Sequence, residues 1–267
     1  MVRAFAVESS SNVGYMKRLA VFASGRGSNF RAIVDHTRMG ILKNIKITLL
    51  LTNDPTAPAV NIARENSISH VFIEGVFGRK FATKLDREKA RDEFDEKAVD
   101  VLKENRIDLI ALAGFLQVLG HEIVRAYPLR IMNIHPAKDL MRFGGPRMFG
   151  ERVHAAVIKA DEKESGCTVH YVDESVDGGP MILQSTVPVE STDTPESLAH
   201  RILIQEHRTY SKAIQLHADD RITVTNSKVS IDWSGNWEEQ WNRRQEAFIQ
   251  YQTEHLRKPE QPLQSNA

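Results

Sequence analysis

The sequence contains very little cysteine: Cys167 is the only one in 267 residues. A single thiol excludes an intramolecular disulfide and a metal site built from several thiolates. The ten histidines also lack ligand spacing, such as two histidines four residues apart with a nearby acid, so we expect no metal. This cysteine usage predicts a reducing cytoplasm as the compartment.

An excess of one charge sign is missing as well. Lys and Arg together number 35 and Asp and Glu together number 35, so the formal net charge is zero. A nucleic-acid surface or an anionic-membrane surface normally needs a local basic excess. In addition, no apolar run approaches the roughly 20 residues that span a bilayer. We therefore expect neither a nucleic acid nor a membrane as a partner.

The sequence does contain an alternation of short apolar runs and amphipathic segments. Apolar runs predict strands at 19–23, 45–51, 71–73, 109–113 and 131–135. Between them, helical spacing predicts helices that begin near 30 and 60, cover 87–105 and lie around 120–126. This order implies an α/β fold with a doubly wound, mostly parallel, Rossmann-like sheet through about residue 136. The wholly apolar run at 109–113 is expected to lie centrally in that sheet.

The pattern changes after residue 136. A Gly-rich loop at 138–150 and a helix near 152–160 precede two strand-like runs at 168–172 and 181–185, which predict an antiparallel extension of the sheet. Thr194 and Pro195 then mark the start of a helix that should run to about residue 216. Its candidate buried positions include Ile202, Ile204 and Ala213, and a last strand is predicted at 221–224.

Three parts of the chain are expected: a flexible leader at 1–16, the α/β domain at 17–225 and a C-terminal extension at 226–267. The extension carries Trp237, Trp241 and Phe248 on one helical face. This favours a helix packed on its own domain or on a partner in a homodimer. The alternative is a recruitment or membrane-surface role. The tail from residue 259 is expected to be disordered.

The turn Gly25-Arg26-Gly27-Ser28-Asn29 lies between the first predicted strand and the first predicted helix. Backbone N–H groups and the helix dipole make such a turn an anion site. The run lacks the third glycine of a dinucleotide fingerprint and the Gly-Lys-Ser of a nucleoside triphosphate loop. A monophosphate is the better hypothesis, and a tight turn that merely needs glycine is the alternative.

Asn133 and His135 share one face of a strand, because successive side chains point to opposite sides. Pro136 should end that strand at the sheet edge where ligands bind. Asp177 is a candidate partner that would raise the pKa of His135 towards neutrality. Amide, imidazole and carboxylate suit direct acyl transfer to an amine. The alternatives are that Asp177 only forms a turn and that His135 is structural. For His170, which lies inside a predicted strand, a structural role is the first expectation.

Six motifs resemble, in order and approximate spacing, those of the phosphoribosylglycinamide formyltransferase family. They lie at 25–29, 113–116, 133–136, 166–170, 177–180 and 205–207. The resemblance covers about residues 17–225. It implies transfer of a formyl group from the co-substrate 10-formyltetrahydrofolate to the amine of glycinamide ribonucleotide in purine synthesis.

The resemblance also implies roles for individual residues. It assigns the ribonucleotide phosphate to Gly27, Ser28 and Asn29, and a further ribonucleotide contact to Glu206. The implied folate-binding residues are Arg91, Leu116, Gln117, Val118, Leu119, Asn133, Asp173, Glu174, Ser175, Val176 and Asp177. The positions of the family's catalytic trio are matched by Asn133, His135 and Asp177, and those of supporting residues by Thr168 and His170.

The chain departs from the family pattern just after the catalytic histidine. Residues 135–141 read His-Pro-Ala-Lys-Asp-Leu-Met, with one extra residue and without the usual second proline. Arg147 also stands where a glycine is usual. Three alternatives to the implied activity remain. The acceptor could be a different amine or water. The chain could be a non-catalytic phosphate- or folate-binding module of the same fold, or the helix that carries Trp237 and Trp241 could serve as a scaffold.

Overall fold

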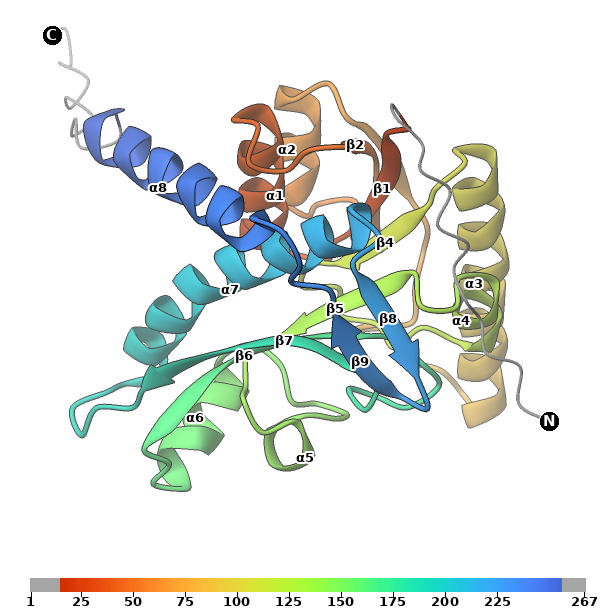
Figure 1. Ribbon diagram of the computed structural model, residues 1–267. Helices are drawn as coiled ribbons and strands as arrows, with labels where there is room; N and C mark the ends of the chain where they lie inside the picture. The colour runs from red at the N-terminus through yellow and green to blue at the C-terminus, as the bar shows by residue number, and fades with distance from the viewer. Residues whose placement is uncertain (1–14, 256–267) are drawn as a thin grey trace, which may run out of the picture.

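Seven strands form one sheet in the order β3-β2-β1-β4-β5-β6-β7, in a computed structural model that describes residues 15–255 (Figure 1). The first five strands run parallel, β6 pairs antiparallel with β5, and β7 pairs antiparallel with β6. The bounds of these strands are β1 Lys17–Phe22, β2 Ile45–Thr52, β3 Ser69–Phe72, β4 Leu109–Leu112, β5 Ile131–His135, β6 Glu164–Tyr171 and β7 Met181–Pro188. The predicted parallel sheet, its central strand β4 and its antiparallel extension are thus confirmed.

Helices cover both faces of this sheet. Their bounds are α1 Ser28–Arg38, α2 Ala59–Glu65, α3 Lys84–Glu104, α4 His121–Ala126, α5 Leu140–Phe143, α6 Glu151–Lys159, α7 Pro195–Ala218 and α8 Trp237–His255. The one-turn helix α5 lies inside the segment that the sequence predicted as a Gly-rich loop. Its N-cap is Asp139, whose carboxylate accepts the N–H groups of Met141 and Arg142, which is why four residues there become helical.

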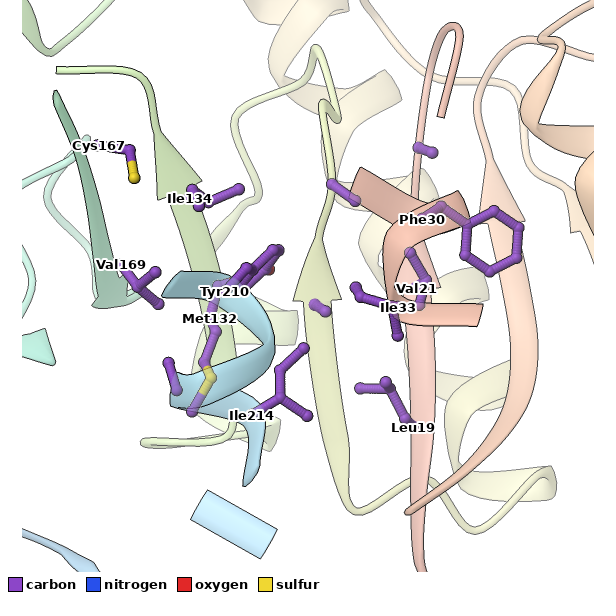
Figure 2. Packing of buried hydrophobic residues seen from close by; sticks show 14 of the residues in the cluster. Leu19, Val21, Phe30, Ile33, Met132, Ile134, Cys167, Val169, Tyr210 and Ile214 are labelled. Carbon is purple, nitrogen blue, oxygen red and sulfur yellow. The ribbon is translucent and has the colours of Figure 1, made fainter. Parts of the chain in front are cut away.

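Successive side chains of β1 point to opposite faces of the sheet and contribute to two separate hydrophobic cores. Leu19 and Val21 belong to a core with α1 and α7, whereas Ala20 and Phe22 belong to a second core with α3 and α4. Figure 2 shows the first core, in which side chains of β1 and α1 lie beside those of β5, β6 and α7. Tyr210 of α7 is fully buried there, and its hydroxyl donates to the carbonyls of Leu112 and Met132. Helices therefore pack on both faces of the sheet, and Tyr210 ties α7 to strands β4 and β5.

The predicted start of α7 is confirmed, because Thr194 caps it and Pro195 occupies its first turn. Ile202 and Ala213 are buried as predicted, but the prediction for Ile204 was wrong: its side chain is 44% exposed. Two residues advance a helix by roughly 200°, so Ile204 faces away from the core that Ile202 faces.

The C-terminal extension begins as a hairpin rather than as a helix alone. Strand β8, Ile222–Thr225, pairs with β9, Lys228–Ile231, in a separate two-stranded sheet, so the predicted boundary after residue 225 falls in the turn between them. Trp237 and Trp241 of α8 are buried and pack with Ile41 and Leu216, which confirms packing on the chain's own domain.

Three predictions concern parts of the chain that lie outside the described residues or side chains. Phe248, the third predicted member of the helical face, lies outside the residues whose side chains are described. The leader lies outside the described residues apart from Tyr15 and Met16, and the predicted disordered tail lies outside them entirely. Within residues 15–255, no helix is both long and apolar enough to cross a membrane.

Candidate active site

The predicted site residues gather at one edge of the sheet. Because β1, β4 and β5 are adjacent and parallel, the segments that follow them emerge on the same side. These segments are the glycine turn (residues 25–29), the 113–119 segment and the end of β5 with His135. The residues predicted the glycine turn and the end of β5, the family resemblance implied residues 116–119, and the strand order brings all three together.

The glycine turn has the geometry of an anion site. Gly27 adopts φ 72° and caps α1, and a Cβ there would lie only 2.9 Å from the Cβ of Ala59. Within the described residues no side chain hydrogen-bonds this helix cap, and the first turn of α1 contains no acidic residue. The N–H groups at the start of α1 are therefore left for a ligand of negative charge.

Asn29 and Glu206 meet directly, although 177 residues separate them in the sequence. The Asn29 amide donates to the Glu206 carboxylate over 2.6 Å, and both side chains are buried. Burial raises the pKa of Glu206, and the hydrogen bond from Asn29 opposes that rise. The Oδ1 atom of Asn29 has no hydrogen-bond partner in the described part of the chain, so this pair retains an acceptor for a ligand.

Asn133, His135 and Asp177, hereafter the trio, also converge. Nδ1 of His135 lies 3.6 Å from Oδ2 of Asp177, and the Asn133 amide donates to Oδ1 of Asp177 over 3.3 Å. The same amide lies 3.2 Å from Nε2 of His170. Antiparallel pairing of β5 with β6 explains the neighbours, because Asn133 pairs with His170 and His135 pairs with Thr168.

The net pKa of His135 is lowered and not raised towards neutrality, although Asp177 contributes a rise as predicted. Burial lowers the pKa of His135 below 6.5, and the nearby Asp177 carboxylate only opposes this effect. Burial alone would raise the pKa of Asp177, but His170, His135 and the Gly145 N–H together lower it below its usual value. The pair at neutral pH is therefore a neutral imidazole beside an ionised carboxylate.

The 137–150 loop closes over the trio. Nε2 of His135 donates to the Phe143 carbonyl over 2.7 Å, and the Gly145 N–H donates to Asp177 over 2.8 Å. Sequence reasoning missed both contacts, although Asp139 as a helix N-cap was a signal that this loop contains a helical turn. Arg147 adopts φ 73°, the left-handed region that favours glycine.

Thr168 anchors the start of this loop. Its hydroxyl donates to the Ala137 carbonyl over 2.8 Å and also accepts from the Gln184 amide over 2.9 Å. Gln184 in turn donates to the Lys138 carbonyl over 2.7 Å. Strands β6 and β7 thus hold the loop where it leaves β5.

Residues 116–119 divide into two groups. The Val118 side chain is 49% exposed, whereas those of Gln117 and Leu119 are buried. Gln117 accepts the Val76 N–H over 2.7 Å, so its side chain binds a neighbouring loop. On α3, Nε of Arg91 is buried without a hydrogen-bond partner among residues 15–255.

Residues 173–176 form an exposed turn next to Asp177. Asp173 accepts the Ser175 N–H over 2.8 Å, and the Ser175 hydroxyl also bonds this carboxylate. Glu174 pairs instead with His121 and Arg125 of α4, at 3.3 and 3.2 Å. In the part of the chain that is described, no group of three or more His, Cys, Asp or Glu side chains is placed to hold a metal ion.

Fold and site together define the class: an α/β protein with a ligand site at the carboxyl edge of a doubly wound sheet. A family model described as formyl transferase matches residues 17–214, and the chain therefore belongs to the formyl transferase family. The chain is 38% identical over 216 residues to phosphoribosylglycinamide formyltransferase, chloroplastic, of Arabidopsis thaliana; the match covers 81% of this chain and 70% of that protein.

Two further comparisons agree with this family. The trifunctional purine biosynthetic protein adenosine-3 of Drosophila melanogaster is 37% identical over 203 residues, which are 75% of this chain and 14% of that much longer protein. The crystal structure of glycinamide ribonucleotide transformylase 1 from Symbiobacterium toebii superimposes with a TM-score of 0.72 at 33% identity, covering 84% of this chain and 99% of that one.

Proposed function

We propose that this protein transfers the formyl group of 10-formyltetrahydrofolate to the amine of glycinamide ribonucleotide, a step of purine biosynthesis. One observation carries the proposal: the amide of Asn133, the imidazole of His135 and the carboxylate of Asp177 converge at the carboxyl edge of the sheet. The names of the related proteins support the same reaction. The glycine turn supports a phosphorylated acceptor.

The trio would act on the reacting groups in three ways. Asn133 would donate a hydrogen bond to the formyl oxygen as negative charge develops on it. His135 would carry a proton from the attacking amine to the leaving nitrogen. Asp177 would stabilise the imidazolium that forms in between, since its carboxylate lies 3.6 Å from the His135 ring. Before Nε2 of His135 can accept a proton from the substrate, the Phe143 carbonyl has to leave it and the ring proton has to sit on Nδ1, which faces Asp177.

The two substrates would occupy neighbouring regions of the same edge. The phosphate would lie on Gly27, Ser28 and Asn29, and Glu206 would accept a hydrogen bond from the ribonucleotide. The folate would lie along residues 116–119 and 173–177, with Arg91 close by. The buried Nε of Arg91 supports this placement, because an unpartnered guanidinium N–H is costly unless a ligand satisfies it.

We also propose a reducing compartment, the cytoplasm, for this chain. Its one cysteine is buried as a free thiol, so the chain cannot form an intramolecular disulfide that an oxidising compartment would maintain. The printed name of the Arabidopsis relative assigns that protein to the chloroplast.

An assay with two competing acceptors tests the reaction. Purified protein is mixed with 10-formyltetrahydrofolate, with and without glycinamide ribonucleotide, and both tetrahydrofolate and formylated ribonucleotide are quantified. We expect the two products in equal amounts and little tetrahydrofolate when the ribonucleotide is omitted. Equal release of tetrahydrofolate without the ribonucleotide would make water the acceptor and overturn the proposal. Protein with His135→Ala, purified in the same way, controls for contaminating enzymes.

A further inference from the structure

Ser24 lies between the two proposed substrate regions, the glycine turn and residues 116–119. It lies two residues after the end of β1, precedes the glycine turn and is only 8% exposed. Its hydroxyl accepts the Leu116 N–H over 2.9 Å and donates to the Asn53 side chain over 2.6 Å. Its backbone N–H donates to the Gly114 carbonyl over 3.1 Å. One side chain therefore joins the segments that follow β1, β2 and β4.

These bonds continue the sheet beyond the point where its strands end. Leu112 is the last residue of β4, and the chain then turns through Gly114 at φ 73°. Beyond the strand ends, a backbone bond from Ser24 to Gly114 still joins two of these segments, and the Ser24 hydroxyl adds the bonds to Leu116 and to Asn53. Ser24 lies just beyond the middle of three adjacent strands, in the order β2-β1-β4, and its side chain bonds the segments that follow both neighbouring strands.

We propose that Ser24 is a positioning residue that sets the distance and orientation between the glycine turn and residues 116–119. The proposal rests on the proposed function, in which the turn holds the ribonucleotide and residues 116–119 hold the folate. The hydroxyl donates its one proton to Asn53 and accepts from Leu116. Its donor is committed within the protein, so Ser24 acts through its neighbours and not by touching a substrate.

The alignment of two bound substrates is what such a residue controls. Formyl transfer needs the amine nitrogen within roughly 3.5 Å of the formyl carbon, and a shift of about 1 Å can cost about 100-fold in rate. Without the Ser24 hydroxyl, the Leu116 N–H and the Asn53 oxygen lose their shared partner, and only the backbone bond from Ser24 to Gly114 still ties the glycine turn to the segment after β4. Each substrate still finds its own contacts, so turnover should fall far more than affinity.

The test compares Ser24→Ala with Ser24→Thr, which keeps a hydroxyl, and with Ser211→Ala. Ser211 is a matched control because its hydroxyl is also buried and lies 2.7 Å from Nδ1 of His36, in the interface of α1 with α7. For each variant, kcat, both KM values, thermal stability and the hydrogen exchange rate of the Leu116 amide are measured.

We expect Ser24→Ala to lower kcat by about 10- to 100-fold while both KM values stay within about threefold. The Leu116 amide should exchange at least about tenfold faster in this variant, because it has lost its acceptor. Ser24→Thr should recover most of both losses. Ser211→Ala should lower thermal stability and leave kcat within about twofold.

Three results would overturn the proposal. They are a kcat for Ser24→Ala within about twofold of wild type, unchanged Leu116 exchange in that variant, and a Ser24→Thr variant that is folded but no better than Ser24→Ala. A wild-type protein that never formylates the ribonucleotide would overturn the proposed function instead. The exchange rates would still decide in that case whether Ser24 holds residues 116–119.

Discussion

The two halves of the candidate site use their polar groups in opposite ways. In the phosphate half (Gly27, Ser28, Asn29 and Glu206), the Asn29 amide and the Glu206 carboxylate bond each other, but the first N–H groups of α1 are uncapped by any described side chain. In the trio, the protein itself occupies the groups: Asn133 bonds Asp177, and His135 bonds the Phe143 carbonyl.

This difference indicates when each half becomes ready for a substrate. The phosphate half is preorganised, because a strand, a tight turn and a helix hold its donors before a ligand arrives. The trio must exchange internal hydrogen bonds for bonds to substrates, and the 137–150 loop provides some of those internal bonds. The phosphate half should therefore govern affinity, and the trio should govern turnover.

Removing the imidazole of the trio gives the largest expected effect. His135→Ala should lower kcat by about 1000-fold, because a positioned proton carrier contributes between about 100- and 10,000-fold. The affinity for glycinamide ribonucleotide, measured by titration calorimetry, should change little. The exposed His200→Ala on α7 is the control. A turnover rate within about tenfold of wild type would show that His135 carries no essential proton.

The protein's stability should also depend on pH through His154, whose pKa is affected by His135 of the trio. His154 of α6 is buried; burial first, and the charge of His135 second, lower its pKa from 6.5 to about 4. As the pH falls below 6.5, the unfolded chain takes up a proton that the folded chain binds only near pH 4. Stability is therefore complete above 6.5 and decreases below it, by about 2 kcal/mol at about pH 5 from this group.

His154→Leu removes this titration with a side chain of similar size. Urea unfolding at about pH 7.5 and about pH 5 should show a loss of stability that is smaller by about 2 kcal/mol than in wild type. His200→Leu on the surface of α7 serves as the matched control. An unchanged pH dependence in His154→Leu would mean that the buried imidazole does not carry the effect.

In the phosphate half, a change at Glu206 should affect affinity and not turnover. Glu206→Gln keeps an oxygen for the Asn29 amide but replaces the second carboxylate oxygen with a donor. We expect the KM for the ribonucleotide to rise by about tenfold, with kcat and the folate KM nearly unchanged. Glu196→Gln, exposed on the same helix, is the control. A fall in kcat without a change in KM would contradict the division between the two halves.

The smallest effect concerns the backbone of the 137–150 loop. Arg147 is exposed and adopts φ 73°, a conformation that costs a non-glycine residue about 1 kcal/mol. Arg147→Gly should raise the free energy of unfolding by up to that amount in a urea titration. Arg152→Gly, inside α6, should lower it by about 1 kcal/mol. A destabilised Arg147→Gly would mean that the arginine side chain makes contacts that outweigh the strain.

Much of the fold was predictable from local pattern. The alternation of Leu19 to Phe22 between two cores, and the cap of α7 at Thr194, involve residues close together in the sequence. The trio was predictable too, because the end of a strand and a glycine-flanked carboxylate are local features. The burial of Ile204 was predicted wrongly, because two residues advance a helix by roughly 200° and place it opposite Ile202.

The sequence by itself determined most of the order of strands and helices, the position of the glycine turn and the candidate trio, because spacing and residue chemistry are properties of neighbours along the chain. Only the tertiary structure decided the lowered pKa of His135, the closure of the 137–150 loop and the bonds of Ser24. Burial and hydrogen-bond partners come from segments far apart in the sequence, and the charge state of a residue depends on what surrounds it.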